Sequence, residues 1–89
     1  MENKKNPDKE FDIFKKAILE FAGKVENDIQ LQIYIKESRK YIEFLINYYL
    51  GLGKLNLVRE RINDLDLTLL IEIEKIGKKL ELSINPQEF

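Results

Sequence analysis

The tetrapeptide Gly51-Leu52-Gly53-Lys54 is the stretch whose residue types come nearest to a chemical site, because glycines beside a lysine can cradle a phosphate. A Walker-type loop needs two glycines separated by four residues and a hydroxyl directly after the lysine. Here Leu55 follows Lys54, and the residues before the glycines look helical. We therefore interpret the stretch as a helix break in which Gly51 or Gly53 adopts a positive φ, with no nucleotide bound.

Other residues that could do chemistry are few and poorly spaced. The chain of 89 residues has no His and no Cys, so a metal site would need carboxylates alone and a nucleophile would have to be a hydroxyl. Asp64 and Asp66 are two residues apart, as are Glu72 and Glu74, so the members of each pair do not face each other on a helix. We expect a protein that is not an enzyme, without cofactor, metal or small-molecule substrate.

One segment resembles the first helix of the all-helical chorismate mutases, whose signature is Arg-x-x-Ile-Asp-x-Ile-Asp-x-x-Leu-Leu. The matching residues are Arg59, Ile62, Leu65, Asp66, Leu69 and Leu70. Asn63 replaces the first aspartate of the signature, and Ile76 stands where the family has its second arginine. Because helical apolar periodicity alone produces the rest of the pattern, we do not expect mutase activity.

Composition limits the class of partner. Charged residues make up 35% of the chain, yet the net charge is −1, whereas a dedicated nucleic-acid-binding protein usually has a basic excess. No apolar run is long enough to span a membrane, and no secretory hydrophobic region follows Met1, so we predict a cytoplasmic protein without membrane contact. Abundant Ile, Leu, Lys and Glu without Cys fits a heat-adapted protein or, equally, an AT-rich genome.

Apolar residues at steps of three and four predict three helices, over residues 7–26, 28–51 and 57–82. Asn6, the segment Glu26-Asn27-Asp28 and Asn56 offer the N-terminal caps, and Asn85-Pro86 ends the third helix. Residues 29–35 alternate between apolar and polar, which would also suit a strand, but a lone strand has no partner in this chain.

These helices predict an all-α fold, either a three-helix up-down-up bundle or a helical hairpin with a third helix packed across it. We expect residues 7–84 to form one domain between a disordered N-terminal tail, 1–6, and a C-terminal tail, 85–89. The residues expected in the core are Phe14, Ile18, Phe21, Leu45, Ile62, Leu65, Leu69 and Ile73. One face of the second helix is expected to carry Leu31, Tyr34, Ser38, Tyr41, Leu45, Tyr49 and Leu52.

Some apolar residues fall outside the main stripes and indicate a protein-binding surface. Leu67 and Ile71 project almost opposite the core stripe of the third helix, with Asp64, Lys75 and Lys78 around them. On the second helix Ile29, Ile33, Phe44 and Tyr48 form a second stripe, and the predicted partner-binding residues in it are Ile33, Phe44 and Tyr48. Lys36, Arg39 and Lys40 form a basic cluster that could contact nucleic acid, although Glu37 and Glu43 reduce its field.

In size, composition and helix layout the chain resembles small all-helical accessory proteins of hyperthermophilic archaea, such as small subunits that accompany a replicative DNA polymerase. The segment from Ser38 through Gly53 to Gly77 is also similar to archaeal helical-hairpin domains. The resemblance implies a non-catalytic accessory or adaptor subunit of a larger protein complex, with DNA replication machinery as one such complex. The alternative is a self-associating homodimer that acts as a small regulator with weak nucleic-acid contact.

Overall fold

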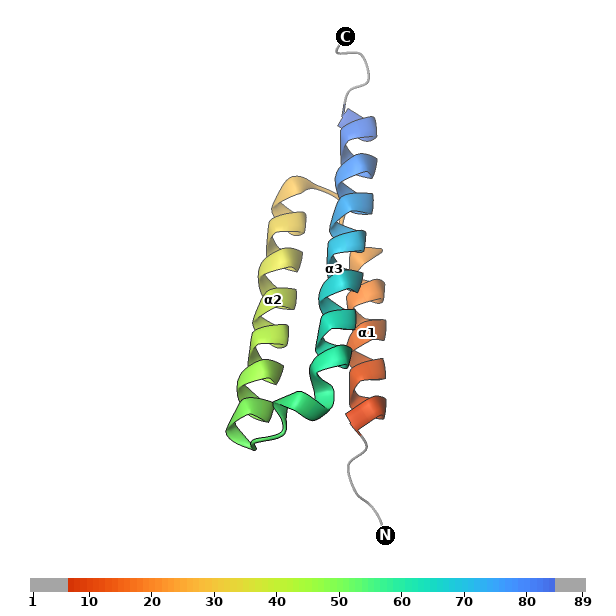
Figure 1. The fold of residues 1–89 in the computed structure, drawn as a ribbon. Helices are drawn as coiled ribbons and strands as arrows, with labels where there is room; N and C mark the ends of the chain where they lie inside the picture. The colour runs from red at the N-terminus through yellow and green to blue at the C-terminus, as the bar shows by residue number, and fades with distance from the viewer. Residues whose placement is uncertain (1–6, 85–89) are drawn as a thin grey trace.

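The computed structural model describes residues 7–84 and folds them into three helices. α1 spans Pro7–Ala22, α2 spans Asp28–Gly51 and α3 spans Leu55–Ile84. The helices run up, down and up, with one short turn at each end (Figure 1). The predicted all-α, three-helix fold is confirmed. The expected tails and the expected caps at Asn6 and Asn85 lie outside the described residues.

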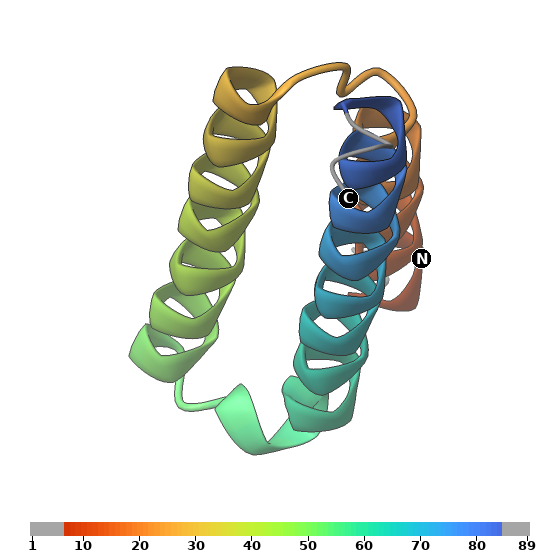
Figure 2. The same ribbon diagram turned by 90° about the horizontal axis from the view of Figure 1, so that it is seen from above.

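α3 is the central helix of the fold. It packs against both α1 and α2, whereas the backbones of α1 and α2 approach each other at few points (Figure 2). The buried apolar residues come from all three helices and from the first turn. They are Phe11, Ile18, Ala22, Val25, Tyr34, Ile42, Leu45, Tyr49, Val58, Ile62, Leu65, Leu69, Ile76 and Leu80.

The predicted core is correct on α3 and partly wrong on α1. Leu65 and Leu69 are each 1% exposed, and Ile18, Leu45 and Ile62 are buried as expected. Phe14 and Ile73 are partly buried at the edge of this core. The prediction that Phe21 lies in the core is wrong, because its side chain is 56% exposed. It lies in the wall of an open groove between α1 and α2, where its ring stays in contact with water.

The face of α2 that meets α3 also differs from the prediction. Tyr34, Ser38, Leu45 and Tyr49 are buried there, together with Ile42. Two other residues expected on this face are exposed: Tyr41 lies on the side of α2 toward α1, and Leu52 is the C-cap residue, beyond the last turn of α2. The alternating residues 29–35 are helical throughout, which decides the helix-or-strand question for this segment.

The turn between α1 and α2 ends in a side-chain cap. Asn27 has extended backbone angles, and its side-chain oxygen accepts a hydrogen bond from the Gln30 backbone N–H at 2.8 Å. The Gln30 side chain reaches back and accepts from the Glu26 backbone N–H at 2.7 Å. The first bond satisfies an N–H group that the start of a helix leaves without a partner, and the second fixes the chain just before the cap, so α2 begins at Asp28 as predicted.

The turn between α2 and α3 is a Schellman motif closed by Gly53, whose φ is 72°. The Gly53 backbone N–H donates to the Leu50 carbonyl at 3.0 Å, and the Lys54 N–H donates to the Tyr49 carbonyl at 2.8 Å. The predicted positive φ is confirmed at Gly53. The predicted Asn56 cap is wrong, because α3 already begins at Leu55 directly after this motif.

Candidate functional site

A groove lies between α1 and α2, on the side of both helices that faces away from the outer surface of α3. Its volume is about 580 Å³ and its walls are almost entirely apolar. The floor includes the buried residues Ile18, Ile42, Leu45 and Leu65. The exposed apolar residues that line the groove are Ile13, Phe21, Ile33 and Tyr41, each between 55% and 60% exposed. The groove exists because α1 and α2 both pack on α3 and leave a space between them.

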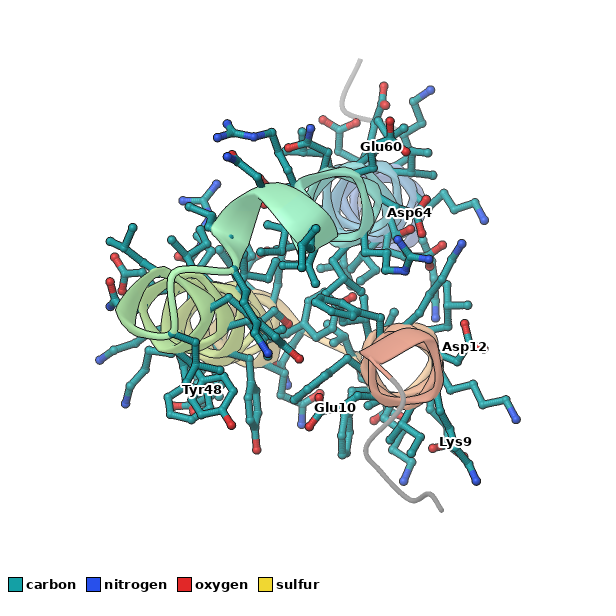
Figure 3. All side chains as sticks on the ribbon, turned by 60° about the horizontal axis from the view of Figure 1, so that its bottom comes forward. Lys9, Glu10, Asp12, Tyr48, Glu60 and Asp64 are labelled. Atoms are coloured by element: carbon teal, nitrogen blue, oxygen red, sulfur yellow. The ribbon has the colours of Figure 1, made fainter. Side chains whose placement is uncertain are left out.

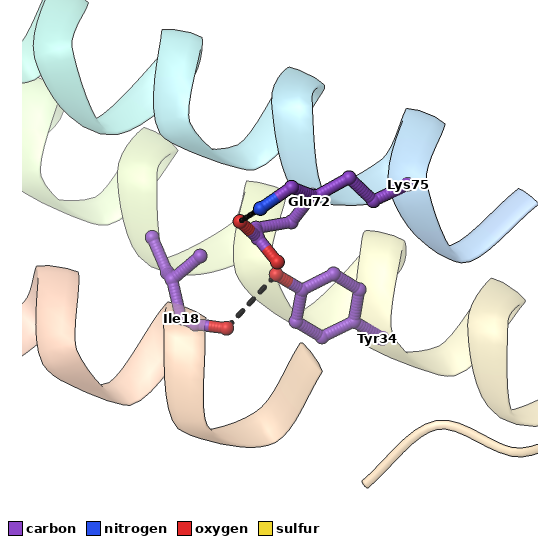
Figure 4. A network of polar contacts seen from close by, with 4 residues as sticks. All are labelled: Ile18, Tyr34, Glu72 and Lys75. Carbon is purple, nitrogen blue, oxygen red and sulfur yellow. Dashed lines mark hydrogen bonds and ion pairs between the residues drawn. The ribbon is translucent and has the colours of Figure 1, made fainter. Parts of the chain in front are cut away.

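A buried tyrosine joins the two walls across the floor of the groove. The Tyr34 hydroxyl donates a hydrogen bond to the Ile18 backbone carbonyl at 2.9 Å (Figure 4). Burial, and then the nearby Glu72 carboxylate, raise the pKa of Tyr34 from 10.0 to about 12. Glu72 is itself paired with Lys75 at 3.4 Å. Tyr34 therefore stays protonated at neutral pH and can keep its donor role.

A second tyrosine joins the walls near the other end of α1. The Tyr49 hydroxyl donates to a Glu10 carboxylate oxygen at 3.1 Å, and the Tyr49 ring stacks on Phe11 with centroids 5.9 Å apart. Burial, followed by the Glu10 hydrogen bond, raises the pKa of Tyr49. Between these two tyrosines, Phe14 meets Tyr41 at 5.3 Å. Polar and aromatic contacts thus hold the walls of the groove at a fixed separation.

Aromatic side chains continue along α2 beyond the groove itself. Phe44 stacks on Tyr48 with centroids 6.1 Å apart, and Tyr48 meets the edge of Tyr49 at 5.1 Å. Phe44 is 59% exposed and Tyr48 is 48% exposed. Figure 3 shows Tyr48 and Glu10 on the same side of the molecule, away from α3. Together with the exposed groove residues, Phe44 and Tyr48 form a continuous apolar surface, which we call the groove face.

Charge is scarce in the groove. Lys24 and Glu37 are its charged lining residues, and the Lys24 ammonium lies 5.5 Å from the centre of the Phe21 ring. A surface with so little charge and so many half-exposed aromatic rings is suited to apolar contact, because aromatic residues contribute much of the energy at protein interfaces.

The five predicted partner-binding residues are all exposed but lie on two separate surfaces. Ile33 lines the groove, and Phe44 and Tyr48 extend the groove face. Leu67 and Ile71 are 56% and 46% exposed on α3, outside the groove. The predicted residues of α2 and those of α3 therefore belong to different surfaces of the molecule.

The basic cluster on α2 lies on a different side from the groove. Lys36, Arg39 and Lys40 line a shallow hollow between α2 and α3. Glu43 and Asp66 line the same hollow, so the cations share it with two carboxylates. The field that this cluster presents to a phosphate backbone is correspondingly weak.

Sequence reasoning misses three groove residues. It assigns Phe21 and Tyr41 to apolar faces that the structure leaves uncovered, and it does not single out Ile13. Their apolar character is the available signal, but their exposure depends on the distance between α1 and α2. Within residues 7–84, no His, Cys, Asp or Glu residues gather in threes to hold a metal ion, and no helix is long and apolar enough to cross a membrane.

No protein family, curated protein or solved structure matches this chain. The geometry of the groove is therefore the main observation that bears on function.

Proposed function

We propose that this protein is a non-catalytic accessory subunit that binds an amphipathic helix of a larger protein in the groove between α1 and α2. The observation that carries the proposal is the groove itself, an apolar channel of about 580 Å³ between two helices whose backbones approach each other at few points. A helix that lies in it would cover residues that water now contacts and would complete a four-helix arrangement.

The shape of the groove favours a helix as the occupant. Its walls are two antiparallel helices, and the shorter wall, α1, has 16 residues, or about 24 Å. A ligand helix of four to five turns, with apolar residues at i, i+3, i+4 and i+7, has the length and periodicity to follow it. Because Lys24 and Glu37 are the charged lining residues, the buried stripe of the ligand should be uncharged.

The apolar area available is large enough for specific binding. Six residues of the groove face are between 48% and 60% exposed: Ile13, Phe21, Ile33, Tyr41, Phe44 and Tyr48. At roughly half exposure, each leaves on the order of 100 Å² of side chain in water. Their sum, roughly 600 Å², lies at the lower end of the roughly 600–1,000 Å² that each partner buries in a standard interface.

Paired variants test the proposal. Phe21→Glu and Ile33→Glu each introduce a charge into the groove, whereas Ile29→Glu introduces the same charge at a residue that is 73% exposed outside it. The parent and the three variants are used as baits in the native cell extract, and circular dichroism confirms that each is folded. A partner should be retained by the parent and by Ile29→Glu and lost from both groove variants.

The identity and binding segment of that partner complete the test. A synthetic peptide of the partner's amphipathic helix should bind the parent in fluorescence anisotropy, and about tenfold or more weakly to Ile33→Glu, because the new carboxylate would be buried one turn from the Glu37 carboxylate. Replicative DNA polymerase subunits among the retained proteins would support the replication role. Equal retention by the parent and both groove variants would contradict the proposal.

A further inference from the structure

The outward side of α3 carries a row of four residues in the order acidic, apolar, apolar, basic. The same row read in the opposite direction places a basic residue against each acidic one. The row consists of Glu60, Leu67, Ile71 and Lys78. Successive members are two turns, one turn and two turns apart, so all four lie on one line along the helix. Leu67 and Ile71 are 56% and 46% exposed, and Lys78 is also exposed. Figure 3 shows Glu60 on the side of α3 away from both α1 and α2.

An antiparallel second copy of α3 matches this row at every position. With the two-fold axis between Leu67 and Ile71, Glu60 of one copy lies opposite Lys78 of the other, and Leu67 lies opposite Ile71. Beside this row, the same axis brings Asp64 of one copy level with Glu74 of the other, and Lys75 lies one residue, about 1.5 Å, further along the helix on the side that Asp64 faces. A parallel pairing would instead place Glu60 against Glu60 and Lys78 against Lys78, which costs free energy.

We infer that the protein forms a two-fold symmetric dimer through an antiparallel contact between the α3 helices of two copies. The apolar centre formed by Leu67 and Ile71 supplies the attraction, and the charged pairs at both ends fix the direction and register. A symmetric contact of this kind uses the same patch on both copies, as most protein dimers do.

The ion pairs within one molecule do not prevent this contact. Asp64 is 3.1 Å from Lys15 of α1, and Lys78 is 4.0 Å from Glu74, but these side chains are between 42% and 73% exposed. Exposed pairs contribute little to stability, so their charges can be shared with a second copy at small cost. The apolar area is below that of a standard interface, so we expect a weak dimer that depends on concentration and salt.

This inference does not depend on the proposed function. The groove opens away from α3, so the dimer contact and the groove use opposite sides of the molecule. Failure of the dimer would leave groove binding unaffected, and failure of groove binding would leave the dimer unaffected.

Charge reversal tests both the contact and its direction. We expect the parent to dimerise with rising concentration in low salt when it is measured by sedimentation velocity. Glu60→Lys and Lys78→Glu should each weaken this dimer about tenfold, because two attractive pairs become repulsive. An equimolar mixture of the two variants should form heterodimers, and the combined variant Glu60→Lys/Lys78→Glu should dimerise like the parent.

The matched control is Lys40→Glu, a reversal at an exposed residue of α2 outside the row, which should dimerise like the parent. Circular dichroism of every variant shows whether its helices are intact. A parent that stays monomeric at all concentrations would overturn the inference. So would single variants that dimerise like the parent, or a mixture of the two that stays monomeric.

Discussion

Gly53 is the one described residue with a positive φ, at 72°, and it closes the Schellman motif after α2. Gly51 lies only two residues earlier but is helical, and neither glycine has a neighbouring atom within 4 Å of where a Cβ would be. Gly53→Ala should therefore lower the free energy of unfolding by about 1 kcal/mol or more through backbone strain alone. Gly51→Ala should leave it unchanged or raise it by up to about 1 kcal/mol. Urea denaturation of both variants measures the difference, and equal effects would contradict the assigned turn.

Tyr34 gives the protein a pH dependence in the alkaline range. Its pKa of about 12 in the folded state lies above the value of about 10 expected in the unfolded chain. The folded state therefore holds the hydroxyl proton more tightly. The resulting stabilisation is complete below pH 10 and is lost as the pH rises from about 10 to about 12, by about 2–3 kcal/mol in all.

Tyr34→Phe isolates this effect. At pH 7 the variant should be less stable than the parent by about 1 kcal/mol, because the hydrogen bond to the Ile18 carbonyl is lost. Above pH 10 the difference between the two proteins should shrink and then reverse, because the phenyl ring of the variant has no proton to lose. Urea unfolding at a series of pH values measures both curves, and curves that stay parallel up to pH 12 would show that Tyr34 does not titrate as described.

For single residues, the sequence predicts the structure best where a residue type has one characteristic conformation or hydrogen-bonding role. The Asn27 cap and the glycine turn are both predictable, because Asn accepts backbone N–H bonds and glycine alone takes a positive φ without cost. The same logic predicts a cap at Asn56, and there it is wrong. The Asn56 side-chain oxygen instead accepts a bond from the Arg59 guanidinium at 3.1 Å, within the first turn of α3. Residue type alone does not distinguish the cap position from the first turn.

Among the helices, α3 supplies the centre of the core, and neighbouring leucines on it allow a controlled test. Leu69 is 1% exposed, whereas Leu70, the next residue, is 55% exposed. Leu69→Ala should destabilise the protein by about 2–5 kcal/mol, the range for a buried leucine. Leu70→Ala should change the stability by less than about 0.5 kcal/mol. Thermal and chemical unfolding compare the two variants, and similar losses from both would mean that the packing of α3 is wrong.

Periodicity predicts the helices well but predicts their faces less well. The bounds of α2 agree with the prediction, and α3 extends two residues beyond it at each end. The predicted end of α1 at residue 26 is wrong, because the chain leaves the helix after Ala22 and turns toward α2. Phe21 and Tyr41 belong to faces that are predicted to be covered, and both are exposed. A periodic stripe shows that a face is apolar, but only the arrangement of the other helices decides whether that face is covered.

For the whole molecule, the sequence predicts the order and direction of the helices but not the distance between them. Short turns between long helices imply the up-down-up order seen here. The groove arises because α3 lies against both other helices and holds them apart, which no local pattern records. This is why the sequence indicates Ile33, Phe44 and Tyr48 as exposed contact residues without indicating the groove that they border.

The same arrangement makes α1 the least protected helix. It is the shortest, with 16 residues, and it packs mainly on α3, the helix farthest from it in the chain. Its main-chain amides should exchange with deuterium faster than those in the middle of α2 and α3, because α1 can detach while the α2–α3 pair stays folded. Hydrogen exchange followed by mass spectrometry measures this order. Equal protection in all three helices would show that the molecule opens only as one unit.

The groove and the outward side of α3 point in opposite directions, and this sets the valency of any dimer formed through α3. Such a dimer presents two grooves that face away from each other, so it can hold two partner helices at once. When both helices belong to one multi-subunit complex, the second binding event is intramolecular, with an effective concentration in the millimolar range. Two weak contacts, one in each groove, would then retain the protein on a large assembly far more firmly than either contact alone, and a partner with a single helix would not gain this advantage.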